Sequence, residues 1–407
     1  MLTQKMRLIL NISAFTLDSV DKSRQPQRTL SDCWGVDPTL SPTLSKVQVR
    51  LSERSYDISI GTDVLSRFGQ LLTETEQVTH AIIVTDNNVR DPHAQAIDAA
   101  VVQAGIKTDL LEVKPGETSK SVEVATSLWN QLLDLGTDRR SVIVAVGGGV
   151  VGDLAGFIAA SFARGISLFQ VPTTLLAQVD SSVGGKVGIN LPGAKNIVGA
   201  FWQPRAVLID TGVLRTLPLR EYRAGLAEVV KYGVILDADF FEFLESRIKQ
   251  LNDRDHETLA EVVARCCQLK AEVVAADERE LTGQRAVLNF GHTFCHALET
   301  VCGYGELLHG EGVSIGMLCA ARLAVATGRI GPEVTSRLDH LLKALQLPRQ
   351  VPKVDHDDLI TAMQHDKKVQ HGRLRFVLPT HIGHVELVDN VNTSDVRQAL
   401  LDSSHGP

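Results

Sequence analysis

Four side chains in the second half of the chain have the residue types and spacing of a metal site. His292 and His296 are four residues apart, so in a helix they share one face, which suits a divalent cation or an anionic ligand. Glu228 lies among apolar residues, so its carboxylate needs a partner, and Lys231 follows three residues later. His309 stands where a loop meets a helix-like stretch. One Glu and two His form a familiar catalytic zinc set, but the spacing leaves open whether His292 or His296 is the ligand.

A glycine-rich turn in the first half has the pattern of a nucleotide site. Gly147-Gly-Gly-Val-Val-Gly-Asp153 follows a strand-like run and opens a helix-like one, so its amides can hold a pyrophosphate. The acidic ribose ligand usual about 20 residues later is missing, and Asp86, after an earlier strand, is the better candidate. Two more polar turns, Pro115–Lys120 and Pro172–Thr174, follow strands. Each alone is typical of a capped helix start, but together they favour a nucleotide cleft.

A glycine-punctuated stretch, residues 178–196, is too polar for ordinary core. It and the later chain carry Asp180, Lys186, Asn190, Lys195, Asn196, Lys270, Arg285, Asn289 and Asp366-Lys-Lys368. Most of these side chains donate to anions, as a substrate with both a carboxylate and a phosphate requires. The alternative for any one of them is a solvated surface charge.

The elements that must position these residues fall into two classes. Up to about residue 217, strand-like runs alternate with helix-like stretches near 94–103 and 121–135, which predicts a parallel sheet. The strand-like runs are residues 47–51, 56–60, 81–85, 141–146 and 166–171. Beyond residue 217 helical periodicity dominates, over residues 221–248, 255–277, 289–302 and 311–327, with a hairpin-like segment at 373–387.

We therefore expect three parts. Residues 1–45, rich in Ser, Thr, Pro and Gln, are expected to be a disordered extension. Residues 46–217 are expected to form an α/β nucleotide-binding domain with a parallel sheet, and residues 218–407 a mainly α-helical domain that binds the metal and the substrate.

The composition excludes several classes of protein. The 407 residues, 44% hydrophobic, are enough for a large core. The chain has 41 Lys and Arg against 48 Asp and Glu, and its sequence has no basic stripe of the kind that binds nucleic acid. No apolar run reaches the roughly 18 residues of a membrane helix. The six cysteines form no Cys-x-x-Cys pair, which favours a reducing compartment and hence the cytoplasm.

The motifs, taken in order, resemble the 3-dehydroquinate synthase family of sugar-phosphate cyclases over about residues 47–400. They are PGE-x-x-K, GGGVVGDLAGF, QVPTTLLAQVDSSVGGKVGIN, GAKN, AEVVKYG, DERE, LNFGHTFCHALE, LLHGEGVSIGM and HDKK. The blocks VDSSVGGK and NFGHTFxHALE are highly specific. The resemblance implies an NAD-binding α/β domain, a helical metal domain and a homodimer.

The resemblance also implies roles for single residues. The zinc ligands, with cobalt or another divalent metal as alternatives, are Glu228, His292 and His309. The catalytic and substrate-binding residues are Asp180, Lys186, Asn196, Lys231, Lys270, Arg285, Asn289, His296, Lys367 and Lys368, with Arg164 reaching the substrate phosphate of the neighbouring subunit. The NAD-binding residues are Asp86, Pro115, Gly116, Glu117, Thr118, Ser119, Lys120, Gly149, Val150, Val151, Gly152, Asp153, Thr173, Thr174, Lys186 and Lys195.

The implied activity is a carbon–oxygen lyase of the shikimate pathway, which leads to chorismate and the aromatic amino acids. It converts 3-deoxy-D-arabino-heptulosonate 7-phosphate to 3-dehydroquinate and phosphate by transient NAD reduction, phosphate elimination, return of the hydride and intramolecular aldol closure. The alternatives are another sugar-phosphate cyclase, whose substrate lacks the carboxylate, or a metal- and NAD-dependent polyol dehydrogenase, which would release NADH. Lys270, Asn289 and His296 favour the dehydroquinate reaction. A non-catalytic nucleotide-binding regulator would have no use for a metal set beside lysines.

Overall fold

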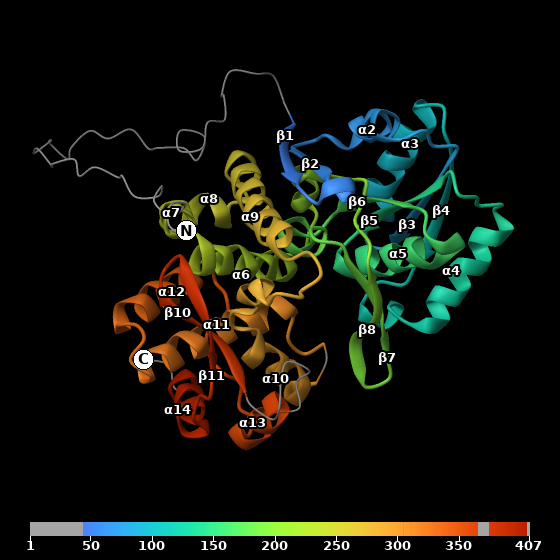
Figure 1. Ribbon diagram of the computed structural model, residues 1–407. Coiled ribbons are helices and arrows are strands. Elements are labelled where there is room, and N and C mark those ends of the chain that lie inside the picture. Colours follow the sequence, from blue (N-terminus) through green and yellow to red (C-terminus); the bar gives the residue numbers. More distant parts are fainter. Residues whose placement is uncertain (1–43, 304, 365–373, 405–407) are drawn as a thin grey trace, which may run out of the picture. The chain divides into compact units, whose positions relative to one another are not determined.

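The computed structural model describes residues 44–303, 305–364 and 374–404 (Figure 1). The predicted extension, residues 1–45, lies outside this range except for its last two residues, and the first strand, β1, already begins at Ser45. Lys367 and Lys368 also lie outside the described residues. The predicted domain boundary after residue 217 stays a prediction.

The first part of the described chain is built on a seven-stranded sheet with strand order β1-β2-β9-β6-β5-β3-β4. The strands are β1 (Ser45–Val49), β2 (Tyr56–Gly61), β3 (His80–Asp86), β4 (Lys107–Val113), β5 (Ser141–Gly147), β6 (Ser167–Pro172) and β9 (Ala206–Asp210). Only β1 pairs antiparallel within this sheet, with β2. All other neighbours are parallel, which confirms the predicted parallel sheet.

Helices cover both faces of this sheet (Figure 1). On one face α2 (Phe68–Thr75) and α3 (Gln95–Gln103) share a core cluster with Ile83 of β3. On the other, α4 (Val122–Asp134) and α5 (Gly149–Ser161) share a second cluster with the adjacent Ile82. Successive side chains of a strand point to opposite faces, so a strand buried on both faces is apolar throughout. This explains the continuous apolar runs in the sequence.

A two-stranded hairpin, β7 (Lys186–Leu191) and β8 (Ala194–Phe201), follows the short helical segment η6 (Ala177–Ser181). The hairpin packs against α5 through β7. The polar, glycine-punctuated stretch was not predicted to form strands, because its composition hides the alternation of side chains that marks a strand.

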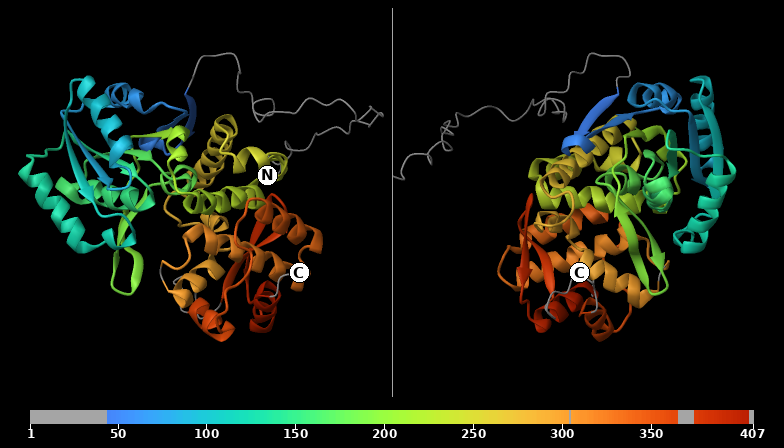
Figure 2. Two further views of the ribbon diagram at one scale, coloured as in Figure 1. Left: turned by 180° about the vertical axis from the view of Figure 1, so that it is seen from behind. Right: turned by 45° about the vertical axis from the view of Figure 1, so that its right-hand side comes forward.

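The second part of the described chain is mainly helical, as predicted. Its helices are α6 (Leu219–Leu236), α7 (Ala238–Ser246), α8 (Ile248–Asn252), α9 (His256–Ala276), α10 (His292–Cys302), α11 (His309–Ala326), α12 (Pro332–Ala344), α13 (His356–Gln364) and α14 (Thr393–Ser404). One hairpin, β10 (Arg375–His381) with β11 (His384–Asp389), packs against α11 and α6 (Figure 2). No helix among the described residues is long and apolar enough to cross a membrane.

Two predicted helices have different bounds in the structure. The stretch 221–248 is not one helix, because Asp237 leaves helical geometry and its side chain caps α7 by accepting from Phe240 N at 3.0 Å. The stretch from residue 289 becomes α-helical only at His292. Residues Gln284–Asn289 form the 3-10 helix η8, and Gly291 adopts a left-handed conformation before α10.

Candidate active site

Three helices bring Glu228, His292 and His309 together. Glu228 lies in the middle of α6 and is fully buried, while His292 and His309 are the first residues of α10 and α11. The Nε2 atoms of His292 and His309 lie 3.5 and 3.6 Å from Glu228 Oε1. One ligand atom from each of the three residues lies within 4.8 Å of the others.

The hydrogen bonds of the His292 and His309 rings decide which nitrogen of each ring can offer a lone pair to a cation beside Glu228. His292 Nδ1 lies 3.0 Å from the carbonyl of Phe290, and His309 Nδ1 lies 3.3 Å from Glu299 Oε1. A carbonyl and an ionised carboxylate only accept, so each Nδ1 carries a hydrogen and each neutral ring presents a lone pair on Nε2. Glu228 Oε1 has no hydrogen-bond partner within the described structure, whereas Oε2 pairs with Lys231. Three electron-pair donors that converge on a buried carboxylate fit a divalent cation such as zinc.

His296 takes a different position from His292. Its ring centroid lies 5.7 Å from that of His292 and 6.5 Å from that of His309. Within the described chain it is His292, not His296, that joins Glu228 and His309. Helical spacing alone had left this choice open. The predicted contact of His296 with substrate stays a prediction.

A row of alternating charges leads away from Glu228. Lys231 forms an ion pair with Glu228 Oε2 inside the protein, and Lys270 Nζ lies 2.8 Å from Asp180 Oδ1. Tyr232 donates its hydroxyl to the same Asp180 oxygen at 2.9 Å. Burial alone would raise the pKa of Asp180, but Lys270 and Lys231 hold it below its ordinary value. The carboxylate of Asp180 therefore stays ionised and orients Lys270.

Two further cations share one carboxylate. Lys186, at the start of β7, contacts Glu280 Oε1, and Arg285 Nε lies 3.7 Å from the same atom. Arg285 is buried and donates from Nη1 to the carbonyl of Glu278 at 2.9 Å. Gly184 has a φ of 99°, and a Cβ there would lie 2.5 Å from Arg285 Nη2, so this close approach requires glycine. Lys186 and Arg285 thus both face the carboxylate of Glu280, so an anionic group is stable at this position.

The residues predicted for NAD form a second network. Lys120 is buried, and its Nζ lies 2.6 Å from Asp153 Oδ2 and 3.6 Å from Glu117 Oε1. The same Nζ contacts Asn196 Oδ1 on β8. Asn190 of β7 donates to Glu117 at 2.8 Å. Asn196, predicted to bind substrate, thus lies with the NAD residues.

The three predicted nucleotide turns follow strands β4, β5 and β6, which lie in one sheet with β3 between β4 and β5. Because parallel strands end at the same edge, Asp86 and the three turns all follow that edge. The turns contain Pro115, Gly116, Glu117, Thr118, Ser119 and Lys120; Gly149, Val150, Val151, Gly152 and Asp153; and Thr173 and Thr174. Helix α5 begins at Gly149, so its first amides face that edge. Burial raises the pKa of Asp86, whose Oδ1 accepts from Asn88 N at 2.8 Å.

Two predicted site residues, Asn289 and Arg164, are not joined to these networks, and a third, Lys195, lies away from the other residues predicted for NAD. Asn289 is partly buried in η8, and Arg164 is exposed in the short segment η5 (Phe162–Arg164) with a φ of 68°. Neither side chain has a hydrogen bond or ion pair within the part of the chain that is described. Lys195, predicted for NAD, instead lies 4.0 Å from Glu299 on α10. Their roles stay predictions.

Sequence reasoning missed Glu299, Tyr232 and Glu280. Glu299 follows His292 by seven residues, two helical turns, so helical periodicity puts it on the same face and was a usable signal. Tyr232 follows Lys231, but its contact is with Asp180, far away in the sequence. Glu280 carries no local signal, because its partners Lys186 and Arg285 come from other elements.

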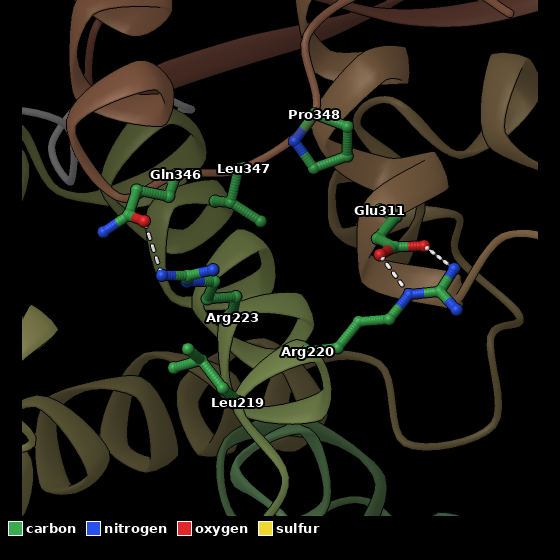
Figure 3. A pocket seen from close by; sticks show the side chains of 7 residues that line it. All are labelled: Leu219, Arg220, Arg223, Glu311, Gln346, Leu347 and Pro348. Carbon is green, nitrogen blue, oxygen red and sulfur yellow. Dashed lines mark hydrogen bonds and ion pairs between the residues drawn. The ribbon is translucent and has the colours of Figure 1, made fainter.

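A cavity of about 340 Å³ is lined by residues of α6, of the first turn of α11 and of the segment 346–348, and by none of Glu228, His292 and His309, the metal set (Figure 3). Its lining residues are Leu219, Arg220, Arg223, Glu311, Gln346, Leu347 and Pro348. Arg220 of α6 holds Glu311 of α11 through two contacts of 2.7 Å, drawn in Figure 3. Glu311 also accepts from Leu308 N at 2.9 Å, which caps α11. The pair therefore ties the helix of Glu228 to the start of the helix of His309.

The fold and the site define a class: a parallel α/β sheet with three polar turns at one edge, followed by a helical part in which two partly exposed histidines converge on a buried glutamate. Family models described as 3-dehydroquinate synthase N-terminal and C-terminal match residues 110–224 and 225–369. A 3-dehydroquinate synthase of Rhodopirellula baltica is 49% identical over 368 residues, 89% of this chain and 98% of the relative. The chain belongs to the 3-dehydroquinate synthase family.

Solved structures of cyclases are also similar. A 2-deoxy-scyllo-inosose synthase complexed with carbaglucose-6-phosphate, NAD+ and Co2+ matches with a TM-score of 0.80 and 29% identity, covering 88% of this chain and 100% of that one. A 2-epi-5-epi-valiolone synthase of Streptomyces hygroscopicus with NAD+ and Zn2+ bound matches with a TM-score of 0.79 and 29% identity, covering 86% and 97%.

Proposed function

We propose that the chain converts 3-deoxy-D-arabino-heptulosonate 7-phosphate to 3-dehydroquinate and phosphate, using NAD and one divalent metal ion, zinc. The observation that carries this is the convergence of His292 Nε2 and His309 Nε2 on Glu228 Oε1, beside buried lysines. Membership of the family supports the reaction, and the two similar cyclase structures, with NAD+ and Co2+ or Zn2+, support the cofactors.

Glu228, His292 and His309 would hold the metal ion, which would supply Lewis acidity for a substrate hydroxyl. The turns after β4, β5 and β6 would hold NAD, which would supply reversible hydride transfer at the carbon that carries this hydroxyl. The chain's own residues bind and orient. Lys231 and Lys270 are held in place by Glu228 and Asp180, so they present fixed positive charge next to the metal set. When the substrate is held in one orientation that suits all the steps of the reaction, these steps need little activation beyond that orientation.

The substrate's two anionic groups account for the cations. Lys186 and Arg285 already share the carboxylate of Glu280, and we assign this position to an anionic group of the substrate. Asn289 and His296 complete the predicted substrate set, as do Lys367 and Lys368 outside the described residues. A cyclase for a substrate without a carboxylate, the nearest alternative, would need fewer of these cations.

We further propose a homodimer in which Arg164 of each subunit contacts the phosphate of the substrate bound by the other. The exposure of Arg164 in a short segment that follows α5 supports this role. We also propose a cytoplasmic location, supported by free thiols at Cys266, Cys267, Cys295 and Cys319.

The test is a substrate comparison with the purified full chain loaded with zinc and NAD. We expect phosphate and 3-dehydroquinate in equal amounts from the heptulosonate phosphate, and little phosphate from sedoheptulose 7-phosphate, which lacks the carboxylate. Faster phosphate release from sedoheptulose 7-phosphate would assign the chain to another cyclase reaction.

A further inference from the structure

We propose that Glu299 is a positioning residue that fixes the tautomer and the ring orientation of His309 at the metal set. The inference rests on the metal set of the proposed function and extends it to a side chain that does not face Glu228. The two ring nitrogens of His309 have different partners. Nε2 lies 3.6 Å from Glu228 Oε1, and Nδ1 lies 3.3 Å from Glu299 Oε1.

The chemistry of the carboxylate determines the direction of this hydrogen bond. An ionised carboxylate only accepts, so Nδ1 of His309 donates to Glu299 and the lone pair of the neutral ring is on Nε2, toward Glu228. Glu299 is only 9% exposed, so water competes little for the contact. A carboxylate that holds the far nitrogen of a metal-binding histidine raises the basicity of the ligand and fixes its direction.

Helix packing keeps the two residues in register. Glu299 lies two turns after His292 on α10, so one helix both supplies a metal ligand and orients another. Helices α10 and α11 pack so closely that a Cβ at Gly312 would lie 2.7 Å from Cys295 Sγ. Cys295 also donates to the carbonyl of His309 at 3.5 Å. The start of α11 therefore has little freedom to move away from Glu299.

Two other roles for Glu299 must be distinguished from this one. Lys195 Nζ lies 4.0 Å from the same Glu299 oxygen, so the carboxylate could serve only to hold the β7–β8 hairpin. Cys295, Glu299 and His309 also offer ligand atoms within 4.8 Å of one another, which is the spacing of a second metal site. The first role predicts that removal of Lys195 acts like removal of Glu299, and the second predicts two metal ions per chain.

The experiment measures zinc binding rather than turnover. The full chain is stripped of metal, and zinc affinity is measured by competition with a chromophoric chelator, with zinc per chain from elemental analysis. We expect one zinc per chain, and about 10- to 100-fold weaker binding in Glu299→Ala. Glu299→Gln, whose amide oxygen still accepts from Nδ1, should lie between Glu299→Ala and the unchanged protein. Lys195→Met and Glu272→Gln, an exposed glutamate of α9, should bind zinc like the unchanged protein.

Each contrary outcome has a distinct meaning. Unchanged affinity in Glu299→Ala, equal weakening in Lys195→Met, or two zinc ions in the unchanged protein and one in Glu299→Ala would overturn the role of Glu299. Failure of the unchanged protein to bind zinc, or full affinity in His292→Ala, would instead overturn the metal set itself.

A second measurement covers the case in which Glu299→Ala does not fold. In the zinc-loaded, 15N-histidine-labelled protein, the signal lost in a His309→Gln variant should show a proton on Nδ1 and none on Nε2. A proton on Nε2 would overturn the proposal without any change at Glu299.

Discussion

Glu228 and Lys231 contact each other one turn apart on α6, with side chains only 1% and 2% exposed. An ion pair without water around it gains stability only while both charges have partners. Burial by itself would raise the pKa of Glu228, but the charge of Lys231 keeps it below its ordinary value. The carboxylate of Glu228 therefore stays negatively charged inside the protein.

This relationship predicts a large loss of stability on removing the lysine. In Lys231→Met the carboxylate of Glu228 keeps its burial and loses its fixed partner, which should cost about 3–5 kcal/mol of unfolding free energy in the metal-free protein. Zinc should restore part of the loss, because a cation bound to the native state stabilises it. Urea unfolding with and without zinc measures both.

A matched control is Lys249→Met. Lys249 also pairs with an acidic residue four positions later, Asp253 at the end of α8, but is 86% exposed, so we expect little change. Equal effects of the two substitutions would contradict the account of Glu228.

His292 and His296 should separate metal binding from substrate binding. His292→Ala should abolish zinc content and activity, because it removes one of three converging ligands. His296→Ala should keep its zinc and lose activity. Elemental analysis of both proteins decides, and full zinc in His292→Ala with loss in His296→Ala would reverse the assignment.

The network at Lys120 should control NAD affinity. Lys120→Met removes the cation shared by Asp153 and Asn196, at the turn predicted to bind NAD. Loss of a charge-assisted contact costs about 1.5–3 kcal/mol, so the dissociation constant for NAD should rise roughly tenfold to a hundredfold. Calorimetry with NAD tests this, with the exposed Lys107→Met as control. An unchanged constant would place NAD elsewhere.

The protein should lose stability in acid when Asp180 becomes protonated. Its folded pKa is depressed, so its contribution is present above the unfolded value of about 3.9 and is lost as the pH falls through the folded pKa. Asp180→Asn should therefore unfold more easily at pH 7, and its difference from the unchanged protein should narrow below about pH 4. A constant difference across this range, followed by denaturant unfolding, would show that the charge of Asp180 does not matter.

Subunit exchange tests the proposed role of Arg164. Arg164→Ala is mixed with a protein disabled by Lys186→Ala, and phosphate release is assayed. If Arg164 acts on the partner's substrate, a mixed dimer has one site with both defects and one intact site, so activity reappears. If it acts within its own subunit, every site keeps one defect and activity stays at the level of the separate variants.

Local pattern was enough to predict the parallel sheet, the helical second part, and the shared face of Glu228 and Lys231. These follow from periodicity, which each segment carries by itself. The contacts of Lys120 with Asn196 and of Lys186 with Glu280 were out of reach, because they join elements distant in the sequence. The contact of His309 with Glu299 depends on how the successive helices α10 and α11 pack. The β7–β8 hairpin was missed for another reason: its glycines and polar side chains hide the alternation that marks a strand.

The proposed reaction regenerates NAD in every turnover, because the hydride leaves and returns to the same carbon. The most direct test is phosphate release from the heptulosonate phosphate by zinc-loaded protein that is stripped of NAD and then given less than one NAD per active site. Many phosphates should be released per NAD, with no NADH accumulating at 340 nm. NADH appearing in proportion to product, with release stopping once NAD is used up, would contradict it and favour a dehydrogenase.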